Sequence, residues 1–265
     1  MTGEPRQPPT ALAIAGSDSG GGAGIQADLK AFARCGVHGM TAITAVTAQS
    51  TTGVSAVHAI PGDLIVEQVR AVTADIGVDA VKIGMLGTVE TIDAVERALA
   101  LTGTAPVVID PVMVAESGAR LLDEDAVHAL RERLLPHAEV VTPNLPEARV
   151  LAGADASPDA LARAIHALGP RAVVVTGGHR DEATDVFFDG ERLEEIPGER
   201  HPDGAAHGSG CTHSSALAAY LARGFEPLDA ARRAKRIASD AVRDGLSRLG
   251  AGAGPVDALG IRRNG

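Results

Sequence analysis

Short runs of apolar residues alternate along the chain with longer segments in which apolar residues recur every three or four positions. The predicted strands cover residues 12–15, 40–48, 78–83, 107–109, 140–141 and 172–175. The predicted helices cover residues 25–34, 64–74, 89–101, 123–135, 145–151, 158–168, 212–223 and 228–244. Because the strands are continuously apolar, they indicate an α/β protein with a mostly parallel sheet and helices on both of its faces.

The order of elements changes after residue 176. Residues 185–188 and 192–196 flank the turn Asp189–Gly190 and predict a small late β-hairpin. No change of composition marks a domain boundary, so the sequence predicts a flexible tail over residues 1–10 and a single domain over residues 11–260. The segment 250–254, rich in glycine and alanine, is expected to form a loop and a loose tail.

Composition narrows the classes of partner. The 265 residues carry a net charge of -10 without a long basic run, which argues against nucleic acid and anionic membranes as partners. The two cysteines, Cys35 and Cys211, are too few for a disulfide framework and are typical of a reducing compartment. The chain also lacks an apolar run long enough to span a membrane, so a cytoplasmic location is expected.

Polar residues and glycines follow the predicted strands. They are Gly16 to Asp18, Gln49 and Ser50, Gly84 and Met85, Asp110 and Pro111, Asn144 with Glu147, and Thr176 to His179. Ligands of open α/β sheets bind beyond the carboxyl ends of the strands, so these residues predict a binding site at that edge.

The glycine turn S-D-S-G-G-G-A-G lies between the first strand and the first helix. It lacks the lysine of a Walker A loop. Gly22, Gly24 and Ala27 fit the dinucleotide-binding pattern, but no acidic residue ends the second strand, which argues against an NAD-dependent oxidoreductase. Asp28, in the following helix, has two interpretations: an acid that the helix dipole favours, or a hydrogen-bond acceptor for a ligand.

Asp110 and Glu147 are candidates for a metal site. Two carboxylates without a neighbouring histidine or cysteine suit Mg²⁺, which needs few protein ligands when phosphate oxygens complete its shell. Glu147 has an alternative role in capping the helix that begins after Asn144. A zinc site made of His207, Cys211 and His213 is disfavoured, because their spacing is not a standard one.

The stretch G-S-G-C, from Gly208 to Cys211, opens a predicted helix. Unpaired N–H groups at such a helix start form a binding site for anions, here a phosphoryl group in transfer. The helix dipole is expected to lower the pKa of the Cys211 thiol, so that its thiolate takes a proton from a substrate hydroxyl. The alternative is that Cys211 is a small residue that only packs the helix start.

Seven motifs carry a family resemblance over residues 11–221. They are G-S-D-S-G-G-G-A-G-I-Q-A-D-L-K, T-A-V-T-A-Q-S, K-I-G-M-L, D-P-V-M-V-A-E-S-G, T-P-N-L-P-E-A, T-G-G-H and H-G-S-G-C-T-H-S-S. In this order they resemble the hydroxymethylpyrimidine/phosphomethylpyrimidine kinases of thiamine biosynthesis, which belong to the ribokinase-like superfamily. The resemblance implies a three-layer α/β/α domain, usually dimeric. It also implies ATP, Mg²⁺ and two successive phosphorylations of 4-amino-5-hydroxymethyl-2-methylpyrimidine (HMP), to the phosphate and then to the pyrophosphate.

The same resemblance implies a role for each candidate residue. Gln49 and Asp28 would hold the pyrimidine, and the residues that wall it would be Gly16, Ala23, Met85 and Val112. Asp110 and Glu147 would bind Mg²⁺ or its waters. Cys211 would be catalytic, and the anion hole would comprise Gly208, Ser209 and Gly210. The nucleotide would contact Thr176, Gly178 and Thr212.

Two departures from the family pattern concern charge. Thr176 stands where the family often has a lysine that meets ATP phosphate, and Glu116 stands where lysine or threonine is frequent. The loss of the lysine leaves less positive charge for the second phosphorylation, which joins two anionic substrates, and it is open whether Arg180 substitutes.

Two alternative functions are weighed against the pyrimidine kinase. A pyridoxal/pyridoxine kinase shares the cysteine motif, although Gln49 and Met85 favour the pyrimidine. A catalytically silent binding protein of the same fold is disfavoured by the intact Asp110, Glu147 and G-S-G-C.

Overall fold

The computed structural model describes residues 7–115, 118, 120–177 and 183–264. Its strands are β1 (Thr10–Ala15), β2 (His38–Ile43), β3 (Ala45–Ser50), β4 (Gly53–Ala59), β5 (Ala80–Ile83), β6 (Val107–Ile109), β7 (Val140–Val141), β8 (Ala172–Val175), β9 (Asp185–Phe188) and β10 (Leu193–Ile196). Its α-helices are α1 (Gly24–Arg34), α2 (Gly62–Asp75), α3 (Val89–Leu99), α4 (Glu124–Ala129), α5 (Leu145–Ala152), α6 (Pro158–His166), α7 (Ser209–Ala222) and α8 (Pro227–Arg243).

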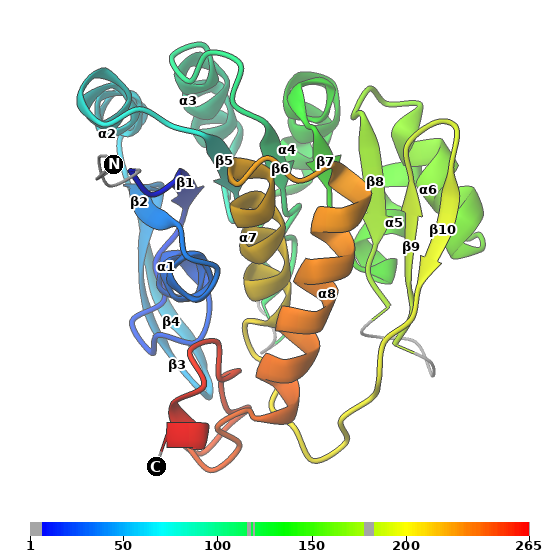
Figure 1. Cartoon of the computed structure of the whole chain (residues 1–265). Coiled ribbons are helices and arrows are strands. Elements are labelled where there is room, and N and C mark those ends of the chain that lie inside the picture. Colours follow the sequence, from blue (N-terminus) through cyan, green and yellow to red (C-terminus); the bar gives the residue numbers. More distant parts are fainter. Residues whose placement is uncertain (1–6, 116–117, 119, 178–182, 265) are drawn as a thin grey trace, which may run out of the picture.

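The central sheet has eight strands in the order β10-β9-β8-β7-β6-β5-β1-β2. Within this sheet, β2, β1, β5, β6, β7 and β8 pair in parallel, and the late hairpin of β9 and β10 adds an antiparallel edge. Figure 1 shows α1, α7 and α8 on one face of the sheet and α2, α3 and α6 on the other. The predicted three-layer α/β/α fold with a mostly parallel sheet is therefore confirmed.

Each face of the sheet carries its own apolar core. In β1, Leu12 and Ile14 join the core beneath α2 and α3, whereas Ala11 and Ala13 join the core beneath α1 and α7. Successive side chains of a strand point to opposite faces, so a strand buried on both faces must be apolar throughout. This explains why the strands appear as continuous apolar runs in the sequence.

The single strand predicted over residues 40–48 is wrong. The chain leaves the main sheet at Thr44, whose N–H bonds to the carbonyl of Ala15 and whose hydroxyl bonds to the carbonyl of Met85. Residues 38–43 form β2, and residues 45–50 form β3, which pairs with β4 in a separate two-stranded sheet. The sequence missed β4 because most of its side chains are exposed, so it lacks an apolar face.

The predicted helix over residues 123–135 is interrupted. Regular α4 ends at Ala129 and continues as a π-helical turn (Leu130–Leu134) and a 3-10 turn (Leu135–His137). Pro136 lacks a backbone N–H, so the α-helical hydrogen-bond pattern ends before it.

The two chain ends differ from the expected tails. Residues 1–6 lie outside the described residues, and Thr10 already belongs to β1. Near the other end, the prediction of a loose tail is wrong, because residues 254–258 are buried and the N–H of Val256 bonds to the carbonyl of His207. The single domain over residues 11–260 stays a prediction, which the continuous sheet from β1 to β10 supports.

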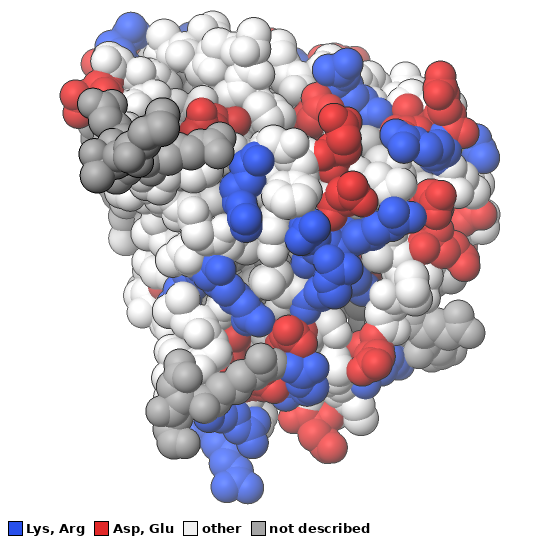
Figure 2. Space-filling view, viewed as in Figure 1, with Lys and Arg blue, Asp and Glu red and all other residues white. Residues whose placement is uncertain are grey.

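Charged side chains of both signs are interspersed on the face that α1, α7 and α8 cover (Figure 2). Among the helices that the structure describes, none has both the length and the apolar character needed to cross a membrane.

Candidate active site

A cavity of about 760 Å³ opens at the carboxyl ends of the parallel strands. Its lining includes most of the residues that the sequence singled out, namely Gly16, Ala23, Gln49, Met85, Asp110, Val112, Glu147, Thr176, Gly208, Ser209, Gly210 and Cys211. The fold brings them together because β1, β5, β6, β7 and β8 all end at this edge. The volume is typical of a site for small molecules.

Three of the predicted site residues are not seen in the cavity lining. Gly178 lies outside the described residues. Asp28 and Thr212 are fully buried beneath the lining, and the Thr212 hydroxyl has no hydrogen-bond partner among the described residues. Asp28 and Thr212 therefore do not line the cavity, and their contacts with a ligand stay a prediction.

Asp18 organises the glycine turn after β1. Its carboxylate accepts hydrogen bonds from the N–H groups of Gly20, Gly22 and Ala23, and from Nε2 of His207 at 3.1 Å. Burial alone would raise the pKa of Asp18, but these hydrogen bonds lower it below its ordinary value. The sequence placed Asp18 at the predicted binding edge but gave it no specific role, although an aspartate before glycines is a known turn signal.

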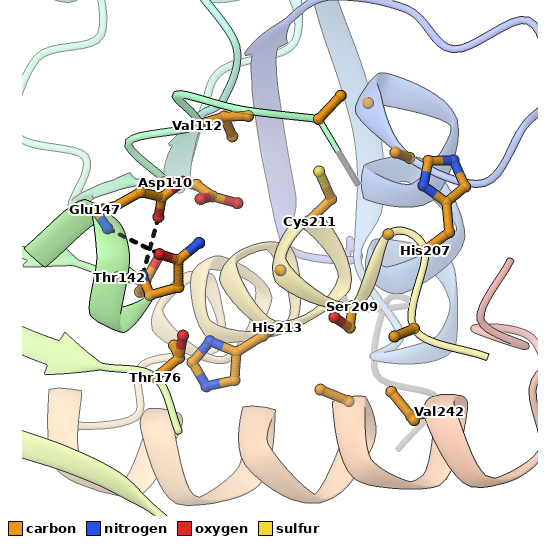
Figure 3. A pocket seen from close by; sticks show the side chains of 18 of the residues that line it. Asp110, Val112, Thr142, Glu147, Thr176, His207, Ser209, Cys211, His213 and Val242 are labelled. Atoms are coloured by element: carbon orange, nitrogen blue, oxygen red, sulfur yellow. Dashed lines mark hydrogen bonds between the residues drawn. The ribbon is translucent and has the colours of Figure 1, made fainter. Parts of the chain in front are cut away.

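The G-S-G-C stretch begins α7 as predicted. Gly208 precedes the helix with a φ of 85°, in the left-handed region that favours glycine. The N–H of Ser209 is bonded to the carbonyl of Ala206, so only the N–H groups of Gly210 and Cys211 would serve the predicted anion hole. Figure 3 shows the side chains of Cys211 and Asp110 projecting into the same part of the cavity.

The predicted low pKa of Cys211 is wrong. Burial raises the pKa of the thiol to about 12, and the negative charges of Asp28 and Asp110 add to this effect. The ammonium of Lys82 acts in the opposite direction but does not outweigh burial. Desolvation disfavours the charged thiolate more strongly than the helix start favours it, so the thiol is protonated before any substrate binds.

Asp110 directly follows β6, and Glu147 lies in the first turn of α5; both line the cavity. Glu147 forms the expected capping box with Asn144, and its Oε1 also accepts the N–H of Met113 at 3.3 Å. Oδ2 of Asp110 accepts the hydroxyl of Ser214 at 3.0 Å. Burial raises the pKa of Asp110; burial, together with the charge of Asp110, raises that of Glu147 to about 8.

These two carboxylates fit a divalent cation. Two buried carboxylates of like charge oppose each other's ionisation, and a cation between them would remove that conflict. The described residues hold no cluster of three or more histidine, cysteine, aspartate or glutamate side chains that suits a metal. The donor set therefore suits an ion that takes its remaining ligands from water and phosphate.

Lys82, which the sequence analysis did not single out, is a central charge of the site. Its Nζ donates to Oδ1 of Asp28 at 2.8 Å, and the same oxygen accepts the hydroxyl of Ser215 at 2.7 Å. A Cβ on Gly84 would lie 2.8 Å from this Nζ, so only glycine leaves room for the ammonium. A lysine inside an apolar strand was the available signal, because lysine is rarely fully buried without a partner.

The ion pair explains the position of Asp28. Its interpretation as a helix-start acid is wrong, because the first turn of α1 holds no acidic residue. Burial raises the pKa of Asp28, whereas Lys82 and Ser215 lower it. Burial tends to lower the pKa of Lys82, but the negative neighbours Asp28, Cys211 and Asp110 raise it above its ordinary value. Lys82 therefore remains a cation in the cavity wall.

A three-layer fold with a glycine-flanked helix start in its cavity, beside two carboxylates and a cysteine thiol, defines a small-molecule kinase of the ribokinase-like class. Residues 18–257 match the model of the phosphomethylpyrimidine kinase family. The chain belongs to this family, so the predicted resemblance and the predicted phosphotransferase class are confirmed.

Individual relatives agree with this assignment. The chain is 51% identical over 255 residues to the hydroxymethylpyrimidine/phosphomethylpyrimidine kinase of Rhizobium meliloti, an alignment that covers 93% of this chain and 95% of that protein. It is 47% identical over 252 residues to the thiamine biosynthesis bifunctional protein ThiED of Geobacter sulfurreducens, covering 93% of this chain and 51% of that longer protein. A solved ADP complex of Bacillus subtilis pyridoxal kinase has a TM-score of 0.88 and 40% identity, over 97% of this chain and 99% of that one.

Proposed function

We propose that the chain transfers the terminal phosphoryl group of ATP to the hydroxymethyl group of HMP, and then a second phosphoryl group to HMP phosphate. The observation that carries this proposal is that one cavity is lined by the residues that the family resemblance singles out, among them Gln49, Met85, Asp110, Glu147 and Cys211. The names of the relatives support the same two substrates. The ADP complex of the pyridoxal kinase neighbour supports ATP as the co-substrate.

The pyrimidine ring lies between the walls formed by Gly16, Ala23, Met85 and Val112, and Gln49 hydrogen-bonds to it. The hydroxymethyl oxygen attacks the terminal phosphorus, and ADP leaves as the bond to the bridging oxygen breaks. The N–H groups of Gly210 and Cys211 bind the transferred phosphoryl group. The active site thus works mainly by positioning and by charge, as phosphoryl transfer requires.

Cys211 accepts the proton of the hydroxyl group in this proposal. Its thiol must first lose its own proton to water, because only a thiolate can act as a base. Lys82 is the nearby cation that favours this ionisation. Asp110 and Glu147 hold Mg²⁺ or its waters, and the ion supplies positive charge to the phosphate oxygens when it is bound.

Incubation with ATP and each acceptor tests the proposal. HMP, HMP phosphate and pyridoxal are supplied separately, and the products are identified by mass spectrometry. The expected products are HMP phosphate and HMP pyrophosphate. Phosphorylation of pyridoxal alone would favour the alternative function, a pyridoxal kinase. The similarity to a solved pyridoxal kinase is the reason for including pyridoxal in the test.

Two further proposals concern the molecule as a whole. We place the protein in the cytoplasm, in keeping with its composition. We also propose a homodimer through the hairpin of β3 and β4, where Val46 and Val57 are 47% and 54% exposed. Light scattering during size-exclusion chromatography tests the dimer, and a Val57→Asp variant is expected to yield the monomer.

A further inference from the structure

The backbone of Gln49 in β3 is held in place by the glycine turn that follows β1. The hydroxyl of Ser19 accepts the N–H of Gln49 at 2.8 Å and donates to its carbonyl at 2.7 Å. The pairing register of β3 with β4 also shifts between Ala48 and Gln49. Such irregularities are common beside active sites, where they redirect a side chain. With the backbone fixed, the orientation of the side-chain amide decides how Gln49 meets a ligand.

Thr47 lies on the same face of β3 as Gln49, because side chains two positions apart in a strand point to the same side. Thr47 is only 4% exposed, whereas Gln49 lines the cavity. The N–H of Thr47 donates to the hydroxyl of Ser17 at 3.2 Å, and its own hydroxyl donates to the carbonyl of Ser17 at 2.8 Å. These two bonds fix the Thr47 hydroxyl beside the Gln49 side chain. None of the chemistry proposed above uses this hydroxyl.

The single proton of the Thr47 hydroxyl determines which end of the amide can face it. Oγ1 of Thr47 lies 3.3 Å from Oε1 of Gln49. A carbonyl can only accept, so the hydroxyl proton is held in the shorter bond to Ser17. Oγ1 then offers only a lone pair to Gln49, and a lone pair requires a donor. Rotating the amide by half a turn exchanges its two ends, so that Nε2 donates to Oγ1 and Oε1 points away from Thr47.

The two ends of an amide select opposite ligands, since the oxygen accepts hydrogen bonds and the nitrogen donates them. In HMP, the substituent next to the reacting hydroxymethyl group is an amino group, whose N–H groups are donors. In pyridoxal, the substituent at the corresponding position is an aldehyde, whose oxygen only accepts. A site built to hydrogen-bond one group rejects an analogue that lacks it, because the polar atom of the site is left unpaired.

We propose that Thr47 is a specificity-determining residue that acts through Gln49: its hydroxyl holds Nε2 of Gln49, so that Oε1 faces the cavity and accepts a hydrogen bond from the amino group of HMP. This inference rests on the proposed function, because it concerns how that site chooses among its acceptor substrates. Thr47 has a positioning role and does not itself touch the substrate.

Calorimetric titration with HMP and with its analogue without the amino group, 5-hydroxymethyl-2-methylpyrimidine, tests the inference. Thr47→Val keeps the branched shape of the side chain and removes the hydroxyl. The variant is expected to bind HMP about 3- to 10-fold more weakly, as for the loss of one hydrogen bond. Its affinity for the analogue is expected not to fall, so the preference for HMP shrinks. With ATP, KM for HMP should rise while kcat stays unchanged.

Three further variants serve as controls. Thr47→Ser keeps the hydroxyl and is expected to retain the affinity for HMP. Thr52→Val removes a hydroxyl from the exposed turn of the same hairpin and is expected to change neither KM nor kcat. Adding Thr47→Val to Gln49→Ala is expected to cause no further loss of HMP affinity, because no amide remains to be oriented.

The orientation of the amide can also be observed in the unaltered protein, which covers the case that Thr47→Val does not fold. NMR spectroscopy with isotope-labelled glutamine detects hydrogens that lie close together. The Nε2 hydrogens of Gln49 are expected to show cross-relaxation with the side chain of Thr47. Its absence would overturn the proposed orientation.

Three outcomes with the variants would also overturn the inference. These are an equal loss of affinity for HMP and its analogue in Thr47→Val, an unchanged affinity for both, or a further loss when Thr47→Val is added to Gln49→Ala. If the unaltered protein phosphorylates neither HMP nor HMP phosphate, the proposed function itself fails. If it phosphorylates HMP and Thr47→Val keeps the same KM and the same preference, only the role of Thr47 fails.

Discussion

Nζ of Lys82 lies 2.8 Å from Oδ1 of Asp28, and both side chains are fully buried. The two residues come from β5 and α1, and they meet where Lys82 lines the cavity and Asp28 lies buried behind it. The pair places one cation next to Cys211 and Asp110, two acidic groups of the cavity lining. If the proposed reaction takes place in this cavity, the same ion pair contributes to the stability of the fold and to the charge around the substrate.

We predict that Lys82→Met destabilises the protein by about 3–5 kcal/mol, because it leaves the carboxylate of Asp28 buried and unpaired. Adding Asp28→Asn is expected to recover most of this loss, as measured by urea unfolding. The double variant should still turn over about 100-fold more slowly, since the ammonium beside the reacting groups is gone. Turnover at the original rate in the double variant would reduce Lys82 to a structural role.

Cys211→Ala is expected to lower kcat by about 100- to 10,000-fold, which is the usual contribution of a positioned general base. HMP binding, followed by calorimetry, should remain unchanged because the walls of the pocket are untouched. Cys35→Ala serves as the control for loss of a thiol, since Cys35 is buried away from the cavity lining. Turnover by Cys211→Ala at the original rate would exclude the base role.

The raised pKa of Cys211 predicts its reactivity. Only the thiolate reacts with iodoacetamide, and its fraction grows about tenfold per pH unit below the pKa. Alkylation of the Cys211 peptide, followed by mass spectrometry, should therefore rise steadily from neutral pH to about pH 10 without a plateau, because the pKa is about 12. A plateau near pH 8 would instead indicate that the helix start outweighs burial.

Gly208→Ala is expected to disrupt the site. A Cβ at this position would lie 1.8 Å from the carbonyl oxygen of Gly22, so the glycine turn and the start of α7 could not approach each other. We expect a loss of about 3 kcal/mol or more in the free energy of unfolding. Gly36→Ala is the matched control, because Gly36 also has a positive φ but a Cβ there meets nothing within 4 Å. The control should cost only about 1–2 kcal/mol, and an equal cost for both variants would contradict the close approach.

The layered fold and the edge at which the site lies could be predicted from the sequence. Continuous apolar runs indicate strands buried on both faces of a sheet. Parallel strands have their carboxyl ends at the same edge of that sheet. This is why the sequence predicts that Gly16, Asp110 and Thr176 line one cavity. These inferences use neighbouring residues only, and local patterns carry that information.

Which charged side chains contact each other depends on how the chain folds in three dimensions. Lys82 and Asp28 are 54 residues apart, Lys235 and Asp185 are 50 residues apart, and His207 and Asp18 are 189 residues apart. No periodicity links such distant positions. The tertiary structure also makes the pKa of Cys211 rise rather than fall. The helix start is a local feature visible in the sequence, whereas the burial that overrides it is created by β1, β5 and α7 packing together.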